Sequence, residues 1–431
     1  MFAGIIAANA LTYVYYALVG RVLGVAGYGV VSALFSATLL IATAPATVAA
    51  TVVTRIAAGL YAAKDHQKLR RLGDLVSAAS AGLGIAAFLA VTVAEPAIAS
   101  YLHLASIAPV LAAGAVLALA FALPLQRSVL QGTQHFSIYA TSMIVETALK
   151  AATGPLLALR FGVTGALAGL AIGSAVSAIY NALILRRLYS GRPARLRFDL
   201  RRMFVSSAGT GSAVLAINAL LFYDVIIVRH AFDPISAGLY GATALVGRAL
   251  YTVVSFIPTI VLPKAAARAA AGAAGPRSLL APALTAAAAI IAGALVVTAA
   301  APGTLVAIIA GRAFATAGPY VLPYVLALSF LALANIVAMY QIGLARLSFV
   351  VPLCTAAASE IATITIWHPT IPAVITVLVC GHCAAFLTTL FRIPLFTAPS
   401  SAESGAPLPS AQKKPLCGDT VQNQNRPAPV A

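Results

Sequence analysis

A glutamate and a lysine lie one helical turn apart in the segment SMIVETALKAATG (142–154), within otherwise apolar sequence. Glu146 precedes Lys150 by four residues, which is the favoured order for an ion pair on one face of a helix. An ionisable side chain at membrane depth costs at least about 2.5–3.5 kcal/mol on insertion scales. Two interpretations follow: the residues neutralise each other as a structural pair, or they face a water-filled cavity. In the cavity, Glu146 could take a proton or cation and release Lys150 to an anionic substrate.

Further ionisable residues lie in apolar runs: Asp224, Arg248 and Glu360, with Arg229 near the end of its run. An arginine stays charged and needs an anion or water, so Arg248 either faces a cavity or pairs with Asp224 across neighbouring helices.

Asp224 and Glu360 each have a structural interpretation as well. Asp224 could be a helix-end acid that is satisfied by Tyr223, by Asn218 or by the membrane interface. Glu360 lies among small residues, which suit either close helix packing or a cavity wall.

The composition places these residues in a membrane protein. Of 431 residues, 61% are hydrophobic and 9% are charged, whereas a soluble domain carries about 25% charged residues. A globule of this size must cover itself with polar groups, and this chain has too few. The sequence therefore predicts an integral membrane protein with many spans.

Runs of about 20 apolar residues mark helices that can cross a bilayer. The continuous apolarity indicates helices and not a barrel, whose strands would be short and alternating. The first run has no basic region before it, so we expect it to remain as a span. Twelve spans are predicted: 2–19, 29–52, 73–94, 105–125, 138–159, 163–185, 204–228, 240–262, 279–301, 319–343, 348–367 and 371–391.

The basic residues between these spans predict the orientation. With the N-terminus inside, 21 of the 27 Lys and Arg residues fall on the cytoplasmic side, Arg127 among them, and four fall on the other side. Lys150 and Arg248 lie within spans. This asymmetry follows the positive-inside rule and explains the net charge of +17 without nucleic acid as a partner. We expect both termini to be cytoplasmic.

The chain divides at the arginine-rich stretch 186–202, with six predicted spans on each side. GVAGYGVVSAL (24–34) resembles SAGLYGATAL (236–245), and each joins the first two spans of its half. Parallel repeats of this kind place a transport site between the halves. The predicted domains are a six-helix lobe (1–185), an Arg-rich cytoplasmic linker (186–203), a second six-helix lobe (204–392) and a disordered cytoplasmic tail (393–431).

Enzymatic signatures are missing from the sequence. It contains no GxxxxGK[ST], HExxH or GxSxG pattern, and the predicted outer loops are too short for a catalytic domain. Cys380 and Cys383 have CxxC spacing, but they lack a second ligand pair and fit better as small packing residues. We predict that the protein is not an enzyme and has neither a cofactor nor a metal site.

Four segments resemble the bacterial polysaccharide (O-antigen type) flippase family of the multidrug/oligosaccharidyl-lipid/polysaccharide exporter superfamily. They occur in the order found in that family: RVLGVAGYG (21–29), LQGTQHF (130–136), RFGVTGALAG (160–169) and DPISAGLYGAT (233–243). The resemblance covers the first two-thirds of the chain. Residues 302–392 show little that is diagnostic, and family members often have fourteen spans where twelve are predicted here.

The resemblance implies an all-α polytopic membrane protein with two six-helix lobes, related by a pseudo-two-fold axis along the membrane normal, around a central cavity. It implies a flippase that moves a polyprenyl-pyrophosphate-linked oligosaccharide from the inner to the outer leaflet of the bacterial cytoplasmic membrane, by alternating access, for surface polysaccharide biosynthesis. Membrane lipids, a glycan polymerase and other polysaccharide assembly proteins are the implied partners.

Site roles follow from the same resemblance. The substrate-binding candidates are Lys150, Arg248 and Arg229, since fixed cations suit a pyrophosphate. The ion-coupling candidates are Glu146, Asp224 and Glu360. The alternative is a cation-coupled drug or metabolite antiporter of the same superfamily.

Overall fold

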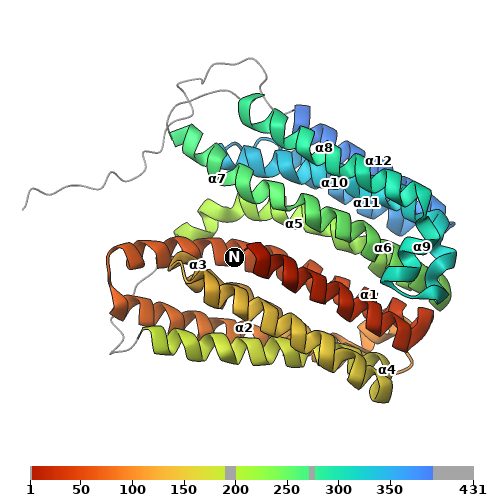
Figure 1. Cartoon of the computed structure of the whole chain (residues 1–431), viewed down its shortest axis with the longest axis horizontal. Helices are drawn as coiled ribbons and strands as arrows, with labels where there is room; N and C mark the ends of the chain where they lie inside the picture. Colours follow the sequence, from red (N-terminus) through yellow and green to blue (C-terminus); the bar gives the residue numbers. More distant parts are fainter. Residues whose placement is uncertain (1, 190–199, 271–276, 392–431) are drawn as a thin grey trace, which may run out of the picture. The chain divides into compact units, whose positions relative to one another are not determined.

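The computed structural model describes residues 2–189, 200–270 and 277–391, and they are helical almost throughout (Figure 1). The predicted tail (393–431) and most of the predicted linker lie outside these residues. The helices of the first half (2–189) are α1 (Phe2–Ala62), α2 (His66–Tyr101), α3 (Ala108–Gly132) and α4 (Phe136–Leu188).

The second half (200–391) begins inside the predicted linker, because its first helix starts at Leu200. Its elements are α5 (Leu200–Ala231), α6 (Pro234–Val254), α7 (Phe256–Ala270), α8 (Arg277–Ala300), α9 (Pro302–Ile309), the short 3₁₀ helix η1 (Arg312–Ala317), α10 (Gly318–Gly343), α11 (Val350–Ile366) and α12 (Ile371–Phe391).

Two of the helices reverse direction at a single glycine. Gly24 interrupts α1 with φ of 65°, and Gly162 interrupts α4 with φ of 57°. Glycine adopts positive φ without the steric penalty of a Cβ atom. The reversal in α1 brings the rings of Tyr16 and Phe35 to 5.8 Å. The gap between the predicted spans 2–19 and 29–52 is therefore not an extended loop: helix continues on both sides of the single turning residue, Gly24.

The twelve predicted spans all fall on helices, although the number of membrane-length helical stretches differs from twelve. Among the described residues, nine helical stretches are long and apolar enough to cross a membrane. Because α1 and α4 each double back, each supplies two crossing segments, and the shorter α11 is the remaining one. The predicted span 240–262 is divided at Ser255, three residues before Pro258, where α6 ends and α7 begins.

The halves pack mainly within themselves and meet along α1. Helices α1, α3 and α4 contact one another, α2 packs on α3, and α10 is the centre of the second half. Between the halves, α1 contacts α5 and α6. Gly29 lies directly against the backbone of Gly238, which brings together the two similar segments noted in the sequence. Small residues permit this close approach of two helices.

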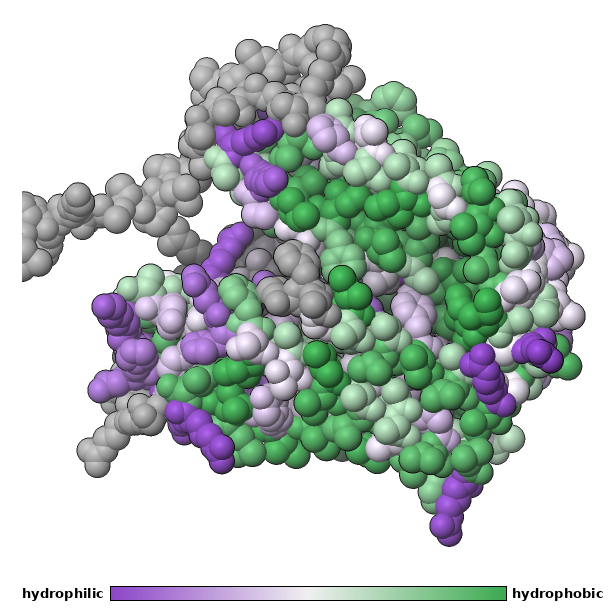
Figure 2. Space-filling model, in the orientation of Figure 1, coloured by the Kyte–Doolittle hydropathy of each residue, from purple (hydrophilic) through white to green (hydrophobic). Residues whose placement is uncertain are grey.

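The surface is suited to lipid. Figure 2 shows hydrophobic residues across most of the visible face, with hydrophilic ones gathered mainly at its two ends. Val93 is 84% exposed and Ile366 is 82% exposed. Exposed apolar area on this scale marks a membrane-facing surface, so the protein is a multi-pass membrane protein. We call the end with Lys68, Arg70, Arg71, Arg186 and Arg187 the basic end.

Candidate functional site

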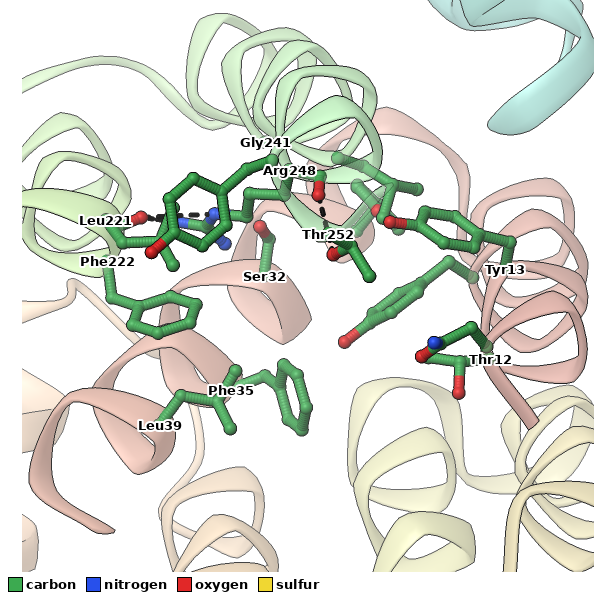
Figure 3. A pocket seen from close by; sticks show the side chains of 15 residues that line it. Thr12, Tyr13, Ser32, Phe35, Leu39, Leu221, Phe222, Gly241, Arg248 and Thr252 are labelled. Atoms are coloured by element: carbon green, nitrogen blue, oxygen red, sulfur yellow. Dashed lines mark hydrogen bonds between the residues drawn. The ribbon is translucent and has the colours of Figure 1, made fainter. Parts of the chain in front are cut away.

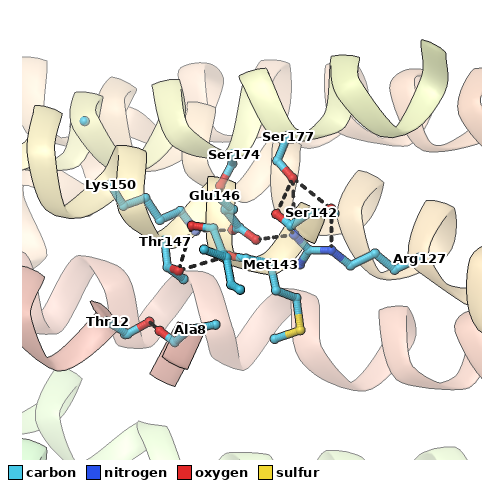
Figure 4. A network of polar contacts seen from close by, with 12 residues as sticks. Ala8, Thr12, Arg127, Ser142, Met143, Glu146, Thr147, Lys150, Ser174 and Ser177 are labelled. Atoms are coloured by element: carbon cyan, nitrogen blue, oxygen red, sulfur yellow. Dashed lines mark hydrogen bonds and ion pairs between the residues drawn. The ribbon is translucent and has the colours of Figure 1, made fainter. Parts of the chain in front are cut away.

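Glu146 bridges two cations in the first half (Figure 4). Its carboxylate forms an ion pair with Lys150 one turn further along α4. Its other oxygen, Oε2, lies 2.7 Å from Nη2 of Arg127 on α3. Ser174 Oγ donates a hydrogen bond to Oε1 at 3.3 Å. The predicted pair is thus a triad with two positive charges and one negative charge.

Arg127 forms hydrogen bonds to both segments of α4, the one before the turn at Gly162 and the one after it. Its Nε donates to Ser142 Oγ at 3.0 Å, and its Nη2 donates to the Ser142 carbonyl at 2.9 Å and to Ser177 Oγ at 3.2 Å. Ser142 precedes the reversal at Gly162 and Ser177 follows it. The turn therefore brings together the two serines that bind Arg127. The sequence interpretation of Arg127 as a loop residue was wrong, because α3 continues to Gly132.

The triad lines a cavity of about 230 Å³. Arg127, Glu146, Lys150 and Ser174 form its polar wall, and α1 supplies the opposite wall. The side chain of Lys150 is 18% exposed, against 9% for Glu146. The ammonium is therefore the more accessible charge, and the wall carries a net positive charge.

Arg248 lies in a second cavity of about 170 Å³, which α1, α5 and α6 enclose (Figure 3). Its Nη1 donates to Ser36 Oγ at 3.0 Å, and its Nη2 donates to the Leu221 carbonyl at 3.0 Å. The guanidinium carbon is 4.8 Å from the centroid of the Phe222 ring, which is cation–π geometry. Phe35 and Leu39 line both cavities, so the two are neighbours across these side chains.

Asp224 pairs with Arg248, as the structural interpretation of the sequence proposed. Its Oδ1 is 3.4 Å from Arg248 Nη2, and its Oδ2 accepts hydrogen bonds from Tyr240 at 2.8 Å and Tyr324 at 2.7 Å. The expected local partners are not used: the Tyr223 hydroxyl meets Thr365, and Asn218 donates to the Val214 carbonyl. Asp224 is fully buried and does not line the cavity that Arg248 lines.

Glu360 lies apart from both cavities and faces His382 of α12. His382 Nε2 is 3.4 Å from Glu360 Oε1 and 3.3 Å from the Leu220 carbonyl, and Nδ1 is 3.0 Å from the Ala327 carbonyl. Both ring nitrogens face acceptors, an arrangement that suits a doubly protonated imidazolium. Glu360 Oε2 is buried and has no hydrogen-bond partner among the described residues.

Arg229 is also separate from the triad and from Arg248. It lies in the last turn of α5, it is 6% exposed, and its Nε has no partner in the described parts of the chain. The structure thus brings Glu146 together with Lys150 and Asp224 together with Arg248, and it leaves Arg229 and Glu360 elsewhere.

Sequence reasoning missed Arg127, His382 and Ser36 as partners. Arg127 follows the apolar run that ends at Leu125, but Val129 and Leu130 continue the apolar pattern and could have extended the helix. Nothing local indicates that His382 meets Glu360. As for metal, no cluster of three or more His, Cys, Asp or Glu side chains suited to an ion occurs in the described ranges.

Comparison of the sequence with protein-family models gives no match, and comparison with curated proteins gives none either. Solved structures do match. An inward-facing multidrug resistance transporter of the MATE family, in the MOP superfamily, aligns over 89% of this chain and 93% of its own, with 13% identity and a TM-score of 0.71. The lipid II flippase MurJ, in an inward closed conformation, aligns over 91% and 87%, with 14% identity and a TM-score of 0.67.

A third match is a MOP superfamily transporter from Pyrococcus furiosus, over 90% of this chain and 93% of its own, with 15% identity and a TM-score of 0.54. At such low identities the likeness establishes the fold. The protein therefore has the fold of MOP superfamily transporters, which confirms the predicted all-α architecture of two lobes about a central cavity. The matched proteins are transporters and flippases and not enzymes.

Proposed function

We propose that the protein is a flippase for a lipid with an anionic head, of the polyprenyl-pyrophosphate-linked oligosaccharide class. It moves this lipid from the inner to the outer leaflet of the bacterial cytoplasmic membrane for surface polysaccharide biosynthesis, with both termini cytoplasmic. One observation carries the proposal: the two adjoining cavities are lined by Arg127, Lys150 and Arg248, against one carboxylate, Glu146.

The excess of fixed cations suits a pyrophosphate. Arginine offers a planar fork of donors to phosphate oxygens, and lysine offers a compact charge. In a low-dielectric space these charges attract an anion and repel a cation. A cationic drug would meet three like charges here, which disfavours it as the substrate.

The contacts suggest how the head group would be taken up and released. Lys150 is held only by Glu146 in the described residues and is the most exposed member of the triad. An anion that enters the cavity competes with Glu146 for this ammonium. Arg127 has three further hydrogen bonds that keep it in place, so it can hold Glu146 while Lys150 turns to the substrate.

Ion coupling is proposed for Glu146, because protonation of its carboxylate would free Lys150. Asp224 already accepts from two tyrosines and pairs with Arg248, so its coupling role would consist of orienting Arg248. Glu360 and Arg229 lie away from both cavities, and their roles in coupling and binding remain predictions of the sequence.

The second candidate is a cation-coupled drug or metabolite antiporter. The buried Glu360–His382 pair favours it, since a carboxylate with one unpartnered oxygen beside an imidazole is able to exchange a proton. The candidates differ in the substrate that they move: an anionic lipid for the flippase, and a soluble organic cation or metabolite for the antiporter.

A reconstituted flipping assay tests the proposal. Proteoliposomes would carry a fluorescent polyprenyl-pyrophosphate oligosaccharide, and accessibility of the label to an outside quencher would report its leaflet. We expect Lys150→Ala and Arg248→Ala each to lower the flipping rate at least tenfold, since loss of a charge-assisted hydrogen bond costs about 1.5–3 kcal/mol. Arg160→Ala, at an exposed arginine beside the turn in α4, is the control and should flip normally.

Full activity in both cavity variants would overturn the cationic-cavity proposal. Uptake of a cationic dye by the wild type, with no flipping of the lipid, would favour the antiporter.

A further inference from the structure

A groove opens on the outer surface of the first half, on the side of α3 and α4 that faces away from the charged triad. It has a volume of about 600 Å³ and is formed by α2, α3 and α4. Small residues make its floor, among them Gly84, Ala118, Ala122 and Ala178. Ile85 is 62% exposed and Ile179 is 61% exposed, so the rim is apolar and faces the membrane.

A buried polar side chain lies in the wall of this apolar groove. Gln126 lines it and is 4% exposed, and its Oε1 has no hydrogen-bond partner in the described parts of the chain. Ser77 and Ser80 line the same part. A buried carboxamide without a partner is costly unless a ligand or water satisfies it. The wall of the groove therefore contains a polar group that needs a partner, and this distinguishes the groove from a simple packing gap between helices.

The groove leads to the basic end of the molecule. Ser77 and Ala182 line both the groove and the adjoining depression formed by Arg70, Asp74 and Arg186. Two arginines face one aspartate there: Arg70 Nε is 3.0 Å and Arg186 Nε is 3.7 Å from Asp74. The Arg186 side chain is 63% exposed, so this mouth presents an accessible positive charge.

The dimensions fit one leaflet. From Ser77 to Leu89 the groove follows α2, and the twelve residue steps between them span about 18 Å at 1.5 Å per residue. The hydrocarbon core of a bilayer is about 30 Å thick, so the groove covers roughly half of it, beginning below the arginines. An acyl chain of ordinary length fits this span, whereas a long polyprenyl chain would extend well beyond it.

We propose that this groove is a binding site for an anionic glycerophospholipid of the surrounding bilayer. The phosphate lies at Arg186 and Arg70, the ester linkage lies at the level of Ser77, Ser80 and Gln126, and one acyl chain fills the groove. Basic pockets between membrane helices recognise anionic head groups in this way. The site is separate from the cavities of the proposed substrate and does not depend on the substrate's identity.

The groove adjoins the helices that carry the charged triad, so a lipid bound in it would affect their packing. Gln126 and Ala175, which line the groove, are the chain neighbours of Arg127 and Ser174, which line the triad cavity. A lipid that fills the groove would therefore support the two helices that hold the charged triad on their other side.

Native mass spectrometry of the purified full chain in detergent tests the site, with phosphatidylglycerol and phosphatidylcholine of identical acyl chains as probes. We expect the wild type to retain phosphatidylglycerol in preference to phosphatidylcholine. Ala178→Trp, which fills the groove, should abolish the retained lipid. Val176→Trp changes an exposed residue of the same helix that does not line the groove, and it should retain lipid as the wild type does.

The charge is tested separately, in a variant that leaves the groove intact. Arg186→Gln should lower the preference for phosphatidylglycerol about fivefold, the effect expected for one basic residue near an anionic lipid. Arg160→Gln, an exposed arginine of the same helix away from the groove, should not change it. Equal retention of both lipids by the wild type would overturn the proposal, as would undiminished retention by Ala178→Trp. Retention of a polyprenyl phosphate with exclusion of phosphatidylglycerol would also overturn it.

Discussion

In the first half, Glu146 holds Arg127 and Lys150 at the wall of a cavity, whereas in the second half Asp224 and the Glu360–His382 pair are enclosed by protein. The first arrangement has one anion for two cations, and its lysine is partly open. In the second half, Asp224 meets two tyrosines and an arginine that turns toward the other cavity. Glu146 and Asp224 both have their partners in place, and in the first half Lys150, which has a single partner among the described residues, is the cation best placed to change partners.

The difference shows that similar folds can carry different chemistry. The halves contact each other through similar glycine-bearing segments at Gly29 and Gly238. The charged residues do not repeat between the halves. The sites are therefore specific to each half, although both halves are built of the same kind of helix.

The largest effect is expected from removal of the bridging anion in the first half. Glu146→Ala would leave Arg127 and Lys150 buried side by side without their carboxylate. Breaking a buried ion pair by removal of one partner costs about 3–5 kcal/mol. We expect a clear fall in the thermal unfolding midpoint of the purified protein, and loss of flipping.

A second substitution distinguishes charge from packing. Lys150→Met in the Glu146→Ala background removes one uncompensated cation at similar volume, so it should recover part of the lost stability. Unchanged unfolding of Glu146→Ala, or no recovery in the double variant, would contradict the view that Glu146 neutralises this cluster.

A smaller effect is expected in the second half, because Asp224 has several donors. Tyr324→Phe removes one hydrogen bond to a charged group, worth about 1.5–3 kcal/mol, and leaves Tyr240 and Arg248 in place. The unfolding midpoint should fall by less than in Glu146→Ala. Tyr320→Phe on the same helix is the matched control. If Tyr324→Phe behaved like Tyr320→Phe, the hydroxyl of Tyr324 would not be what satisfies Asp224.

The helices could be predicted well from the sequence because a membrane span has a length and composition that are visible locally. The positions of two turns could also be predicted, because the gaps between predicted spans at 20–28 and 160–162 contain Gly24 and Gly162. The form of the turns could not, since a reversal at a single glycine leaves almost no loop. The predicted span 105–125 ended too early for the opposite reason: the polar residues Gln126 and Arg127 interrupt the apolar run, although the backbone stays helical to Gly132.

Partners of charged residues were predictable only along one helix. Glu146 and Lys150 are four residues apart, and spacing alone predicted their contact. Arg127 reaches Glu146 from another helix, and Tyr324 reaches Asp224 across 100 residues of sequence. Contacts of that kind depend on how helices pack, and residue types in a single sequence do not determine it.

The smallest effects on stability are expected at two helix N-termini outside the membrane segments, one in each half. Asp65 begins α2 and accepts from the Lys68 amide at 3.0 Å, and Asp233 begins α6 and accepts from the amides of Ile235 and Ser236 at 2.9 and 3.0 Å. The hydrogen bond from Lys68 lowers the pKa of Asp65, and the bond from Ser236 lowers the pKa of Asp233. A lowered pKa in the folded state means that the ionised carboxyl contributes stability above its unfolded pKa near 3.8. That contribution is lost as the pH falls below this value.

Asparagine substitutions separate the cap from the charge at these two positions. Asn is as good an N-cap as Asp, so Asp233→Asn should unfold like the wild type at pH 7. Below about pH 3.8 the wild type should become slightly less stable, and the variant should lack that decline. Asp65 also forms an ion pair with Lys68 at 2.7 Å. Asp65→Asn should therefore lower the unfolding midpoint slightly at low salt, and the difference should vanish at high salt because exposed pairs are screened. Thermal unfolding at two salt concentrations measures this. A salt-independent loss in Asp65→Asn would show that the cap of α2, and not its ion pair, stabilises the start of that helix.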